Sequence, residues 1–236
     1  MLLYLLIACC EPVCDIPGRT VVDLETRDGV GLVADYYPAS LAARPGVVLL
    51  HMNPETYDRT VWPCDFLGEL VDRDWHVIVP DRRGAGESEG NPTDAFEGEA
   101  GRYDVEVATA FLADAGCTNL GMVGASNGTT SMVDYAVWAP GQGLPEPLVL
   151  AFLSGGTYTE NQTSLSDVAA LGTPGVFYYP PEEADWNEAL AATAPGNWKF
   201  HEVEAGGHGT AMLDDDNTVG PELVATFGQV LDASAR

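Results

Sequence analysis

The pattern of apolar and polar positions predicts a sheet with helices between its strands. Continuous apolar runs, typical of strands buried on both faces, recur along the chain. Asp28-Gly29 lies between the first two predicted strands and indicates a hairpin turn. The predicted strands are Thr20–Glu25, Gly31–Tyr37, Gly46–His51, His76–Pro80, Leu120–Gly124, Leu148–Leu153, Gly175–Tyr179 and Phe200–Glu204.

Apolar residues at helical spacing occupy several of the segments between these strands. Helices are predicted over Thr60–Asp72, over Tyr103–Ala115, from Gly128 to about Trp138, and over Pro221–Leu231. Strands that alternate with helices indicate a mainly parallel sheet covered on both faces. The sequence therefore predicts an α/β fold with an N-terminal antiparallel hairpin, in a single domain over residues 15–236.

The charge of the chain argues against some classes of partner. Ten Lys and Arg residues stand against 36 Asp and Glu residues, which gives a formal net charge of −26. Nucleic-acid binding needs clustered cations that displace counterions from phosphates, so no nucleic-acid partner is expected. Docking on an anionic membrane through a basic patch is also disfavoured, because the chain has few cationic residues.

The first ten residues, MLLYLLIACC, form an apolar run. This run is shorter than the roughly 20 residues that span a bilayer. Residues 1–14 are predicted to be a signal or lipoprotein segment, because Leu6-Ile7-Ala8-Cys9 resembles a bacterial lipobox with Cys9 as the lipidation site. The expected location is exported or lipid-anchored in a bacterial envelope, with the N-terminal lipid as the only membrane attachment. The alternative is a cytoplasmic protein with a mis-set start codon or a buried first strand.

The cysteines do not predict a metal site. The chain has Cys9, Cys10, Cys14, Cys64 and Cys117, whose spacing matches no zinc pattern. If Cys9 is lipidated, four cysteines remain, enough for two disulfides in an oxidising compartment. Their pairing stays open, and no metal or cofactor is expected.

A serine motif gives the sharpest chemical signal. Gly124-Ala125-Ser126-Asn127-Gly128 has the form G-x-S-x-G, with a predicted strand before it and a predicted helix after it. A serine on such a turn is exposed, and the free N–H groups of the helix start face developing negative charge. A serine hydroxyl needs a base to become a good nucleophile. His208, in a glycine-rich loop after the last predicted strand, is the best candidate among the four histidines.

The base in turn needs an orienting carboxylate. Glu182, Glu183 and Asp185 all follow the strand Gly175–Tyr179. We favour Asp185, with Glu183 and then Glu182 as alternatives. The order along the chain is then serine, acid, histidine.

Four segments in order resemble the α/β-hydrolase superfamily, over about residues 20–235. The segments are HMNP at 51–54, DRRGAGES at 81–88, GASNG at 124–128 and GGHGT at 206–210. The resemblance implies Ser126 as nucleophile, His208 as base and Asp185 as acid. It also implies an oxyanion hole from the backbone N–H groups of Asn127 and of Asn53, with Met52 as the alternative to Asn53. His51 is expected to be structural.

The segment after the sixth predicted strand bears on the substrate. About 17 residues, 157–173, precede the next strand, where the superfamily commonly inserts a cap domain. So short a segment permits one short helix, which predicts an open cleft without a large cap. Tyr57, Tyr158 and Trp186 are candidate aromatic residues of that cleft.

The leading hypothesis is a lidless serine esterase that forms an acyl-enzyme with an accessible or small-molecule ester. A peptidase, a thioesterase or an acyltransferase with the same triad is the alternative within catalysis, because fold does not choose among them. A non-catalytic lipoprotein or binding protein that retains the fold is the alternative from another class.

Overall fold

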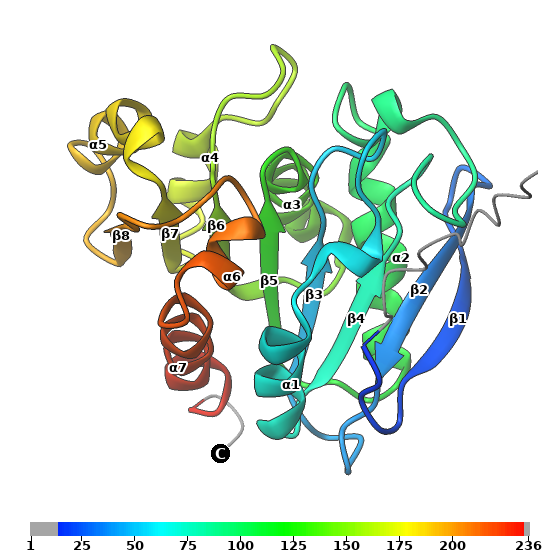
Figure 1. Cartoon of the computed structure of the whole chain (residues 1–236). Helices are drawn as coiled ribbons and strands as arrows, with labels where there is room; N and C mark the ends of the chain where they lie inside the picture. Colours follow the sequence, from blue (N-terminus) through cyan, green and yellow to red (C-terminus); the bar gives the residue numbers. More distant parts are fainter. Residues whose placement is uncertain (1–13, 234–236) are drawn as a thin grey trace, which may run out of the picture.

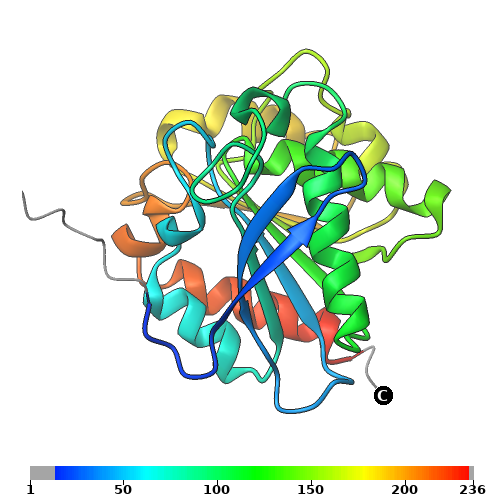
Figure 2. The same cartoon turned by 90° about the vertical axis from the view of Figure 1, so that its right-hand side faces the viewer.

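A single sheet organises the part of the chain that the computed structural model describes, residues 14–233. Its strands follow the order β1-β2-β4-β3-β5-β6-β7-β8 (Figure 1). Strand β2 is antiparallel to β1 and β4, and the remaining pairs are parallel. Figure 2 shows the β1–β2 hairpin at one edge of the sheet. The strands are β1 (Thr20–Glu25), β2 (Gly31–Tyr37), β3 (Gly46–Leu50), β4 (His76–Pro80), β5 (Leu120–Ala125), β6 (Pro147–Leu153), β7 (Gly175–Tyr179) and β8 (Trp198–Glu202).

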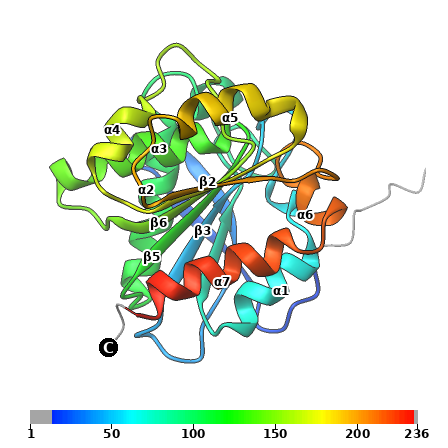
Figure 3. The ribbon, with the colours of Figure 1, turned by 90° about the vertical axis from the view of Figure 1, so that its left-hand side faces the viewer.

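Helices cover both faces of this sheet (Figure 3). One face packs against α1 (Cys64–Asp72), α6 (Ala211–Asp215) and α7 (Val219–Leu231). The other face packs against α2 (Gly101–Asp114), α3 (Gly128–Trp138), α4 (Leu165–Ala170) and α5 (Ala184–Ala191). The central strands are apolar on both faces: Val47 and Leu49 contribute to the first core, and Val48 and Leu50 to the second. The predicted α/β class, with a mainly parallel sheet, an N-terminal antiparallel hairpin and helices on both faces, is confirmed.

Local differences from the predicted elements have simple causes. The predicted helix Thr60–Asp72 is divided by Pro63 into a 3-10 turn, Arg59–Val61, and α1. Trp62 takes extended backbone angles, as a residue before proline favours. The short helices α5 and α6, of 8 and 5 residues, were not predicted, since so few residues give little periodicity. Helix α4 is the one helix between β6 and β7, which fits the prediction of no large cap domain.

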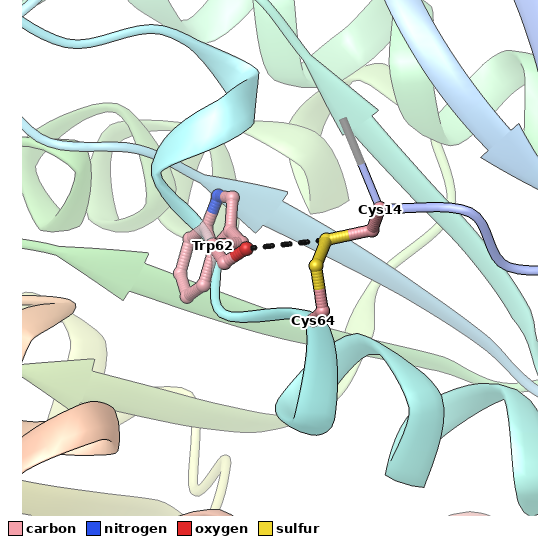
Figure 4. Close-up of a disulfide and its surroundings, with 3 residues drawn as sticks. All are labelled: Cys14, Trp62 and Cys64. Carbon is pink, nitrogen blue, oxygen red and sulfur yellow. Dashed lines mark hydrogen bonds between the residues drawn. A yellow bond between two sulfur atoms is a disulfide. The ribbon is translucent and has the colours of Figure 1, made fainter. Parts of the chain in front are cut away.

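A disulfide joins Cys14 to Cys64, which lie 50 residues apart in the sequence (Figure 4). Cys64 is the first residue of α1. Cys117 carries a free, partly buried thiol. The predicted lipidation site Cys9 and the predicted segment 1–14, except Cys14, lie outside the described residues. Among residues 14–233, no helix has the length and apolar character needed to cross a membrane.

Candidate active site

A sharp turn between β5 and α3 presents Ser126. This serine has φ +50°, in the left-handed region, and it is one of three such non-glycine residues in the described chain. The start of the helix that follows packs tightly against the end of β3. A Cβ on Gly128 would lie only 2.3 Å from the carbonyl oxygen of Leu50. A Cβ on Gly124 would similarly lie 2.9 Å from the Thr129 backbone. The two glycines therefore permit the close approach that holds the serine at the carboxyl end of the sheet.

A hydrogen-bonded series links Ser126 to a histidine and a carboxylate. His208 Nε2 lies 2.7 Å from Ser126 Oγ, and His208 Nδ1 lies 2.6 Å from Glu183 Oε1. With Nδ1–H donating to the carboxylate, Nε2 is free to accept from the serine hydroxyl. This is the arrangement in which a histidine acts as general base toward a serine. The structure thus brings together the predicted serine and the predicted histidine.

The acid of this series is Glu183, which corrects the preference for Asp185. A 3-10 turn, Pro181–Glu183, follows β7, and α5 begins immediately at Ala184. Residues two apart on a helical turn point to different sides, so Glu183 and Asp185 cannot both face His208. Asp185 and Glu182 are exposed, and neither forms a hydrogen bond to His208. Glu183, the first alternative to Asp185 in the sequence analysis, is therefore the acid that contacts His208.

The end of β3 is held by the buried imidazole of His51. Its Nδ1–H donates to the Met52 carbonyl at 2.8 Å, and its Nε2 accepts from the Arg82 backbone N–H at 2.9 Å. Burial, reinforced by the charge of Arg82, lowers the pKa of His51 to about 3, so the ring is neutral. His51 is therefore a structural residue of the loop, as expected.

Three backbone N–H groups near Ser126 remain available. Within residues 14–233, the N–H groups of Met52, Asn53 and Asn127 donate no hydrogen bond. Met52 is buried, and the Asn53 side-chain oxygen accepts from Glu55 N–H at 3.1 Å. The residues predicted to supply an oxyanion hole thus carry unused donors.

Sequence reasoning missed Ser154, which directly follows β6. Ser154 is buried with φ +58°, and its Oγ accepts from Gly209 N–H at 2.8 Å, which anchors the His208 loop. Tyr158 donates its hydroxyl to the Ser154 carbonyl. Burial raises the pKa of Tyr158 to about 12, although hydrogen bonding to Ser126 opposes this shift. The predicted cleft residue Tyr158 therefore lies beside the serine, whereas nothing in the local sequence distinguished Ser154.

Arg82 was also missed as an individual residue. The sequence analysis took DRRGAGES only as a motif, yet the Arg82 side chain is completely buried and donates to the backbone on both sides of the site. The available signal was an arginine two residues after a continuous apolar strand, since charged residues are rarely fully buried without a specific partner.

A cavity of about 470 Å³ lies between α5 and the loop that precedes α4. Its walls include Thr157, Leu165, Trp186 and Leu190. Trp186 Nε1 donates to Thr157 Oγ1 at 3.4 Å across this space. Its lining residues Thr157 and Thr159 flank Tyr158 in the chain, and none of Ser126, Glu183 and His208 lines it. Among the described residues, no group of three or more His, Cys, Asp or Glu side chains could hold a metal ion.

Comparisons with known proteins identify the fold. No family model matches the sequence, and no curated protein matches it. The structure is similar to an esterase of Pyrococcus furiosus, Pf2001, with a TM-score of 0.70 and 14% identity over 90% of this chain and 91% of that chain. It is also similar to the α/β hydrolase GrgF of Penicillium sp. sh18, with a TM-score of 0.69 and 12% identity over 91% of this chain and 99% of that chain.

A third similar structure is the dienelactone hydrolase of Anabaena variabilis, with a TM-score of 0.68 and 14% identity over 90% of this chain and 98% of that chain. At such low identity, these matches establish the shared fold. The chain has the α/β-hydrolase fold, as the resemblance of its four segments implied.

Proposed function

We propose that the protein is a serine hydrolase that cleaves carboxylic esters. The observation that carries the proposal is the continuous series from Ser126 Oγ through His208 to Glu183, with distances of 2.7 and 2.6 Å. The names of the similar structures, which include an esterase and a dienelactone hydrolase, support hydrolysis as the reaction class.

The geometry supports a two-step mechanism. Ser126 Oγ attacks the ester carbonyl carbon while His208 Nε2 accepts the hydroxyl proton, and Glu183 holds His208 in the Nδ1–H tautomer and stabilises the imidazolium. The tetrahedral intermediate collapses as His208 gives its proton to the departing alcohol oxygen. A water molecule, deprotonated by His208, then attacks the acyl-enzyme carbonyl and releases the carboxylic acid.

The oxyanion would be stabilised by backbone donors. The N–H of Asn127 lies on one side of the elbow, and the N–H of Asn53, or of Met52 as the alternative, lies at the end of β3. Loss of one such donor typically costs about 3 kcal/mol of transition-state stabilisation. The free N–H groups described above support this assignment.

The substrate is proposed to be a small or accessible ester. Only α4 separates β6 from β7, so no large cap encloses the serine. The cavity beside Trp186 and Leu190 would receive one part of the ester. An amide, a thioester or an alcohol acceptor would use the same residues in a peptidase, thioesterase or acyltransferase.

An exported, disulfide-bonded state is proposed with this activity. The Cys14–Cys64 bond supports it, because disulfides form and persist in oxidising compartments. Attachment through a lipid on Cys9 is tested by cell fractionation of wild type and Cys9→Ser. Equal membrane association of the two proteins would rule out the lipid anchor.

The activity is tested by labelling with a fluorophosphonate probe and by a panel of p-nitrophenyl esters, thioesters and amides. Wild type should be labelled and should hydrolyse esters fastest, and Ser126→Ala should lose both properties. Ser166→Ala, at an exposed serine of α4, is the matched control and should behave as wild type. Folded wild type that takes up no label would refute the proposal and leave the non-catalytic alternative.

A further inference from the structure

Arg82 occupies an unusual electrostatic environment beneath the candidate site. It lies two residues after the end of β4, and its side chain is 0% exposed. No carboxylate of the described chain contacts its guanidinium. The nearby Asp104 is instead hydrogen-bonded to Arg83. A cation buried among neutral groups is costly to desolvate, so it needs a specific reason to be there.

The guanidinium joins both sides of the proposed oxyanion hole. On the β3 side, Nη1 donates to the carbonyl oxygens of His51 and Met52 at 3.1 and 3.2 Å. On the elbow side, Nη1 donates to Asn127 Oδ1 at 2.8 Å and Nη2 to the Asn127 carbonyl at 3.3 Å. Nη2 also donates to the Ala95 carbonyl at 2.7 Å and to Ser131 Oγ at 2.9 Å.

These contacts fix the direction of the free N–H groups. A trans peptide holds its C=O and N–H in one plane, pointing in opposite directions. The described chain contains no cis peptide. The carbonyls of His51 and Met52 point at Arg82, so the N–H groups of Met52 and Asn53 in the same two peptides point away from it. The guanidinium therefore orients both candidate donors of the β3 loop.

The charge of Arg82 also acts on these peptides. A donor at a carbonyl oxygen polarises the whole amide, which makes its N–H a stronger donor. Burial lowers the pKa of Arg82 to about 10, with Asp104 opposing and Arg83 adding to this shift, so the side chain stays protonated near neutral pH. A fixed positive charge at low dielectric also favours negative charge that develops nearby.

We propose that Arg82 is a positioning residue that orients and polarises the Met52 and Asn53 N–H groups, the β3-side donors of the oxyanion hole, through the carbonyl oxygens of their peptides. The inference rests on the proposed serine-hydrolase function and extends it to a residue that does not touch the substrate. A residue that merely held the loops together would contribute to folding. Its loss would not weaken the binding of a negatively charged species at the site in particular.

The test compares Arg82→Gln and Arg82→Lys with the matched control Arg83→Gln. Arg83 is a neighbouring buried arginine of the same loop, but its partners are Asp28 and Asp104. The readouts are kcat and KM for p-nitrophenyl acetate, the inhibition constant of phenylboronic acid, and the thermal unfolding midpoint. Ser126 Oγ bonds to the boron of the boronic acid while His208 Nε2 takes the serine proton, which gives a tetrahedral boronate anion at Ser126.

For Arg82→Gln, we expect a drop in kcat of about tenfold to a hundredfold, below the full loss of a direct donor. KM should change less than about threefold, while boronate affinity falls in step with kcat. Arg82→Lys, which keeps the charge with fewer fixed donors, should recover part of both losses. Arg83→Gln should lower the unfolding midpoint and leave kcat and boronate affinity near wild type.

Unchanged boronate affinity in a folded Arg82→Gln protein, or equal effects in Arg82→Gln and Arg83→Gln, would overturn the proposal. Should Arg82→Gln not fold, Arg82→Lys decides: kcat and boronate affinity must fall together relative to Arg83→Lys, and unchanged values refute the role. Failure of the proposed function is a distinct result, because wild type would then neither hydrolyse the ester nor bind the boronate through Ser126.

Discussion

The buried neutral ring of His51 predicts a specific loss of stability in mild acid. Burial, reinforced by the charge of Arg82 and opposed by the Met52 carbonyl and the Asp58 carboxylate, lowers the pKa of His51 to about 3. In the unfolded chain, the same imidazole takes up a proton near its ordinary pKa of about 6.5. Between these two values the unfolded state binds the proton and the folded state does not. The free energy of unfolding should therefore decrease as the pH falls through this range.

The size of the effect follows from the two pKa values. At pH 5, protonation of the unfolded imidazole lowers its free energy by about 2 kcal/mol, and the folded state gains almost nothing. This figure depends mainly on the unfolded pKa, because any folded value below about 4.5 gives nearly the same result. It is a substantial part of the roughly 5–15 kcal/mol that stabilises a typical domain.

The assay is urea unfolding at pH 7, 6 and 5, followed by both tryptophan fluorescence and far-ultraviolet circular dichroism. His51→Gln removes the titrating group and keeps a side chain that can donate and accept hydrogen bonds. The absolute stability of this variant does not affect the test, because only the change in the free energy of unfolding between pH 7 and pH 5 is compared. Wild type should lose about 2 kcal/mol more than His51→Gln between pH 7 and pH 5. Parallel pH profiles would refute the reasoning.

Three further predictions address the acid, the disulfide and the cavity. Glu183→Gln should lower kcat by about 10²–10⁴-fold in ester hydrolysis, since the His208 tautomer and the imidazolium lose their carboxylate, while Asp185→Asn should stay near wild type. Replacing Cys14 and Cys64 by alanine should lower the free energy of unfolding by up to about 4 kcal/mol, measured by urea unfolding, because it frees a loop that spans 50 residues. Leu190→Trp should raise KM several-fold for bulky esters in steady-state kinetics and leave kcat for the acetate ester nearly unchanged, because it fills the 470 Å³ cavity.

Matched variants control these three predictions. Glu182→Gln changes an exposed neighbouring acid, Cys117→Ala removes the free thiol, and Glu188→Trp adds bulk to an exposed position of α5. Each control should resemble wild type in the corresponding assay. A larger kcat loss in Asp185→Asn than in Glu183→Gln, equal stability with and without the disulfide, or an unchanged KM in Leu190→Trp would contradict the respective prediction.

The fold was predictable because its signal is local and repeated. The run Val47–Leu50 is apolar at every position, and the structure places alternate members in the two cores on opposite faces of the sheet. Helix α5 gave no comparable signal, since its first turn is acidic and its inward side is limited to residues such as Asn187 and Leu190. The order of strands is a property of long-range pairing and was not predicted.

The residues of the candidate site also fall into two groups: those that local sequence motifs indicate and those whose role depends on the folded chain. Ser126 and His208 stand in local motifs that follow predicted strands, so sequence could nominate them. The choice of Glu183 depends on a 3-10 turn that points one of three nearby acids at His208, and no residue pattern encodes that direction. Arg82 acts through partners as many as 49 positions away, which only the folded chain brings together.

The disulfide determines how a pulling force applied before Cys14 is transmitted into the fold. Strand β1 is an edge strand held to β2 by one antiparallel ladder, which a pull on the preceding chain would otherwise open one pair at a time. Cys14 precedes β1 and is bonded to Cys64, so tension applied from the N-terminal side passes into α1 and bypasses the hairpin. Helix α1 packs against α7 in the core, so the load is distributed over a buried interface. A tethered form of this protein would resist force at the helix pair rather than at its weakest sheet edge.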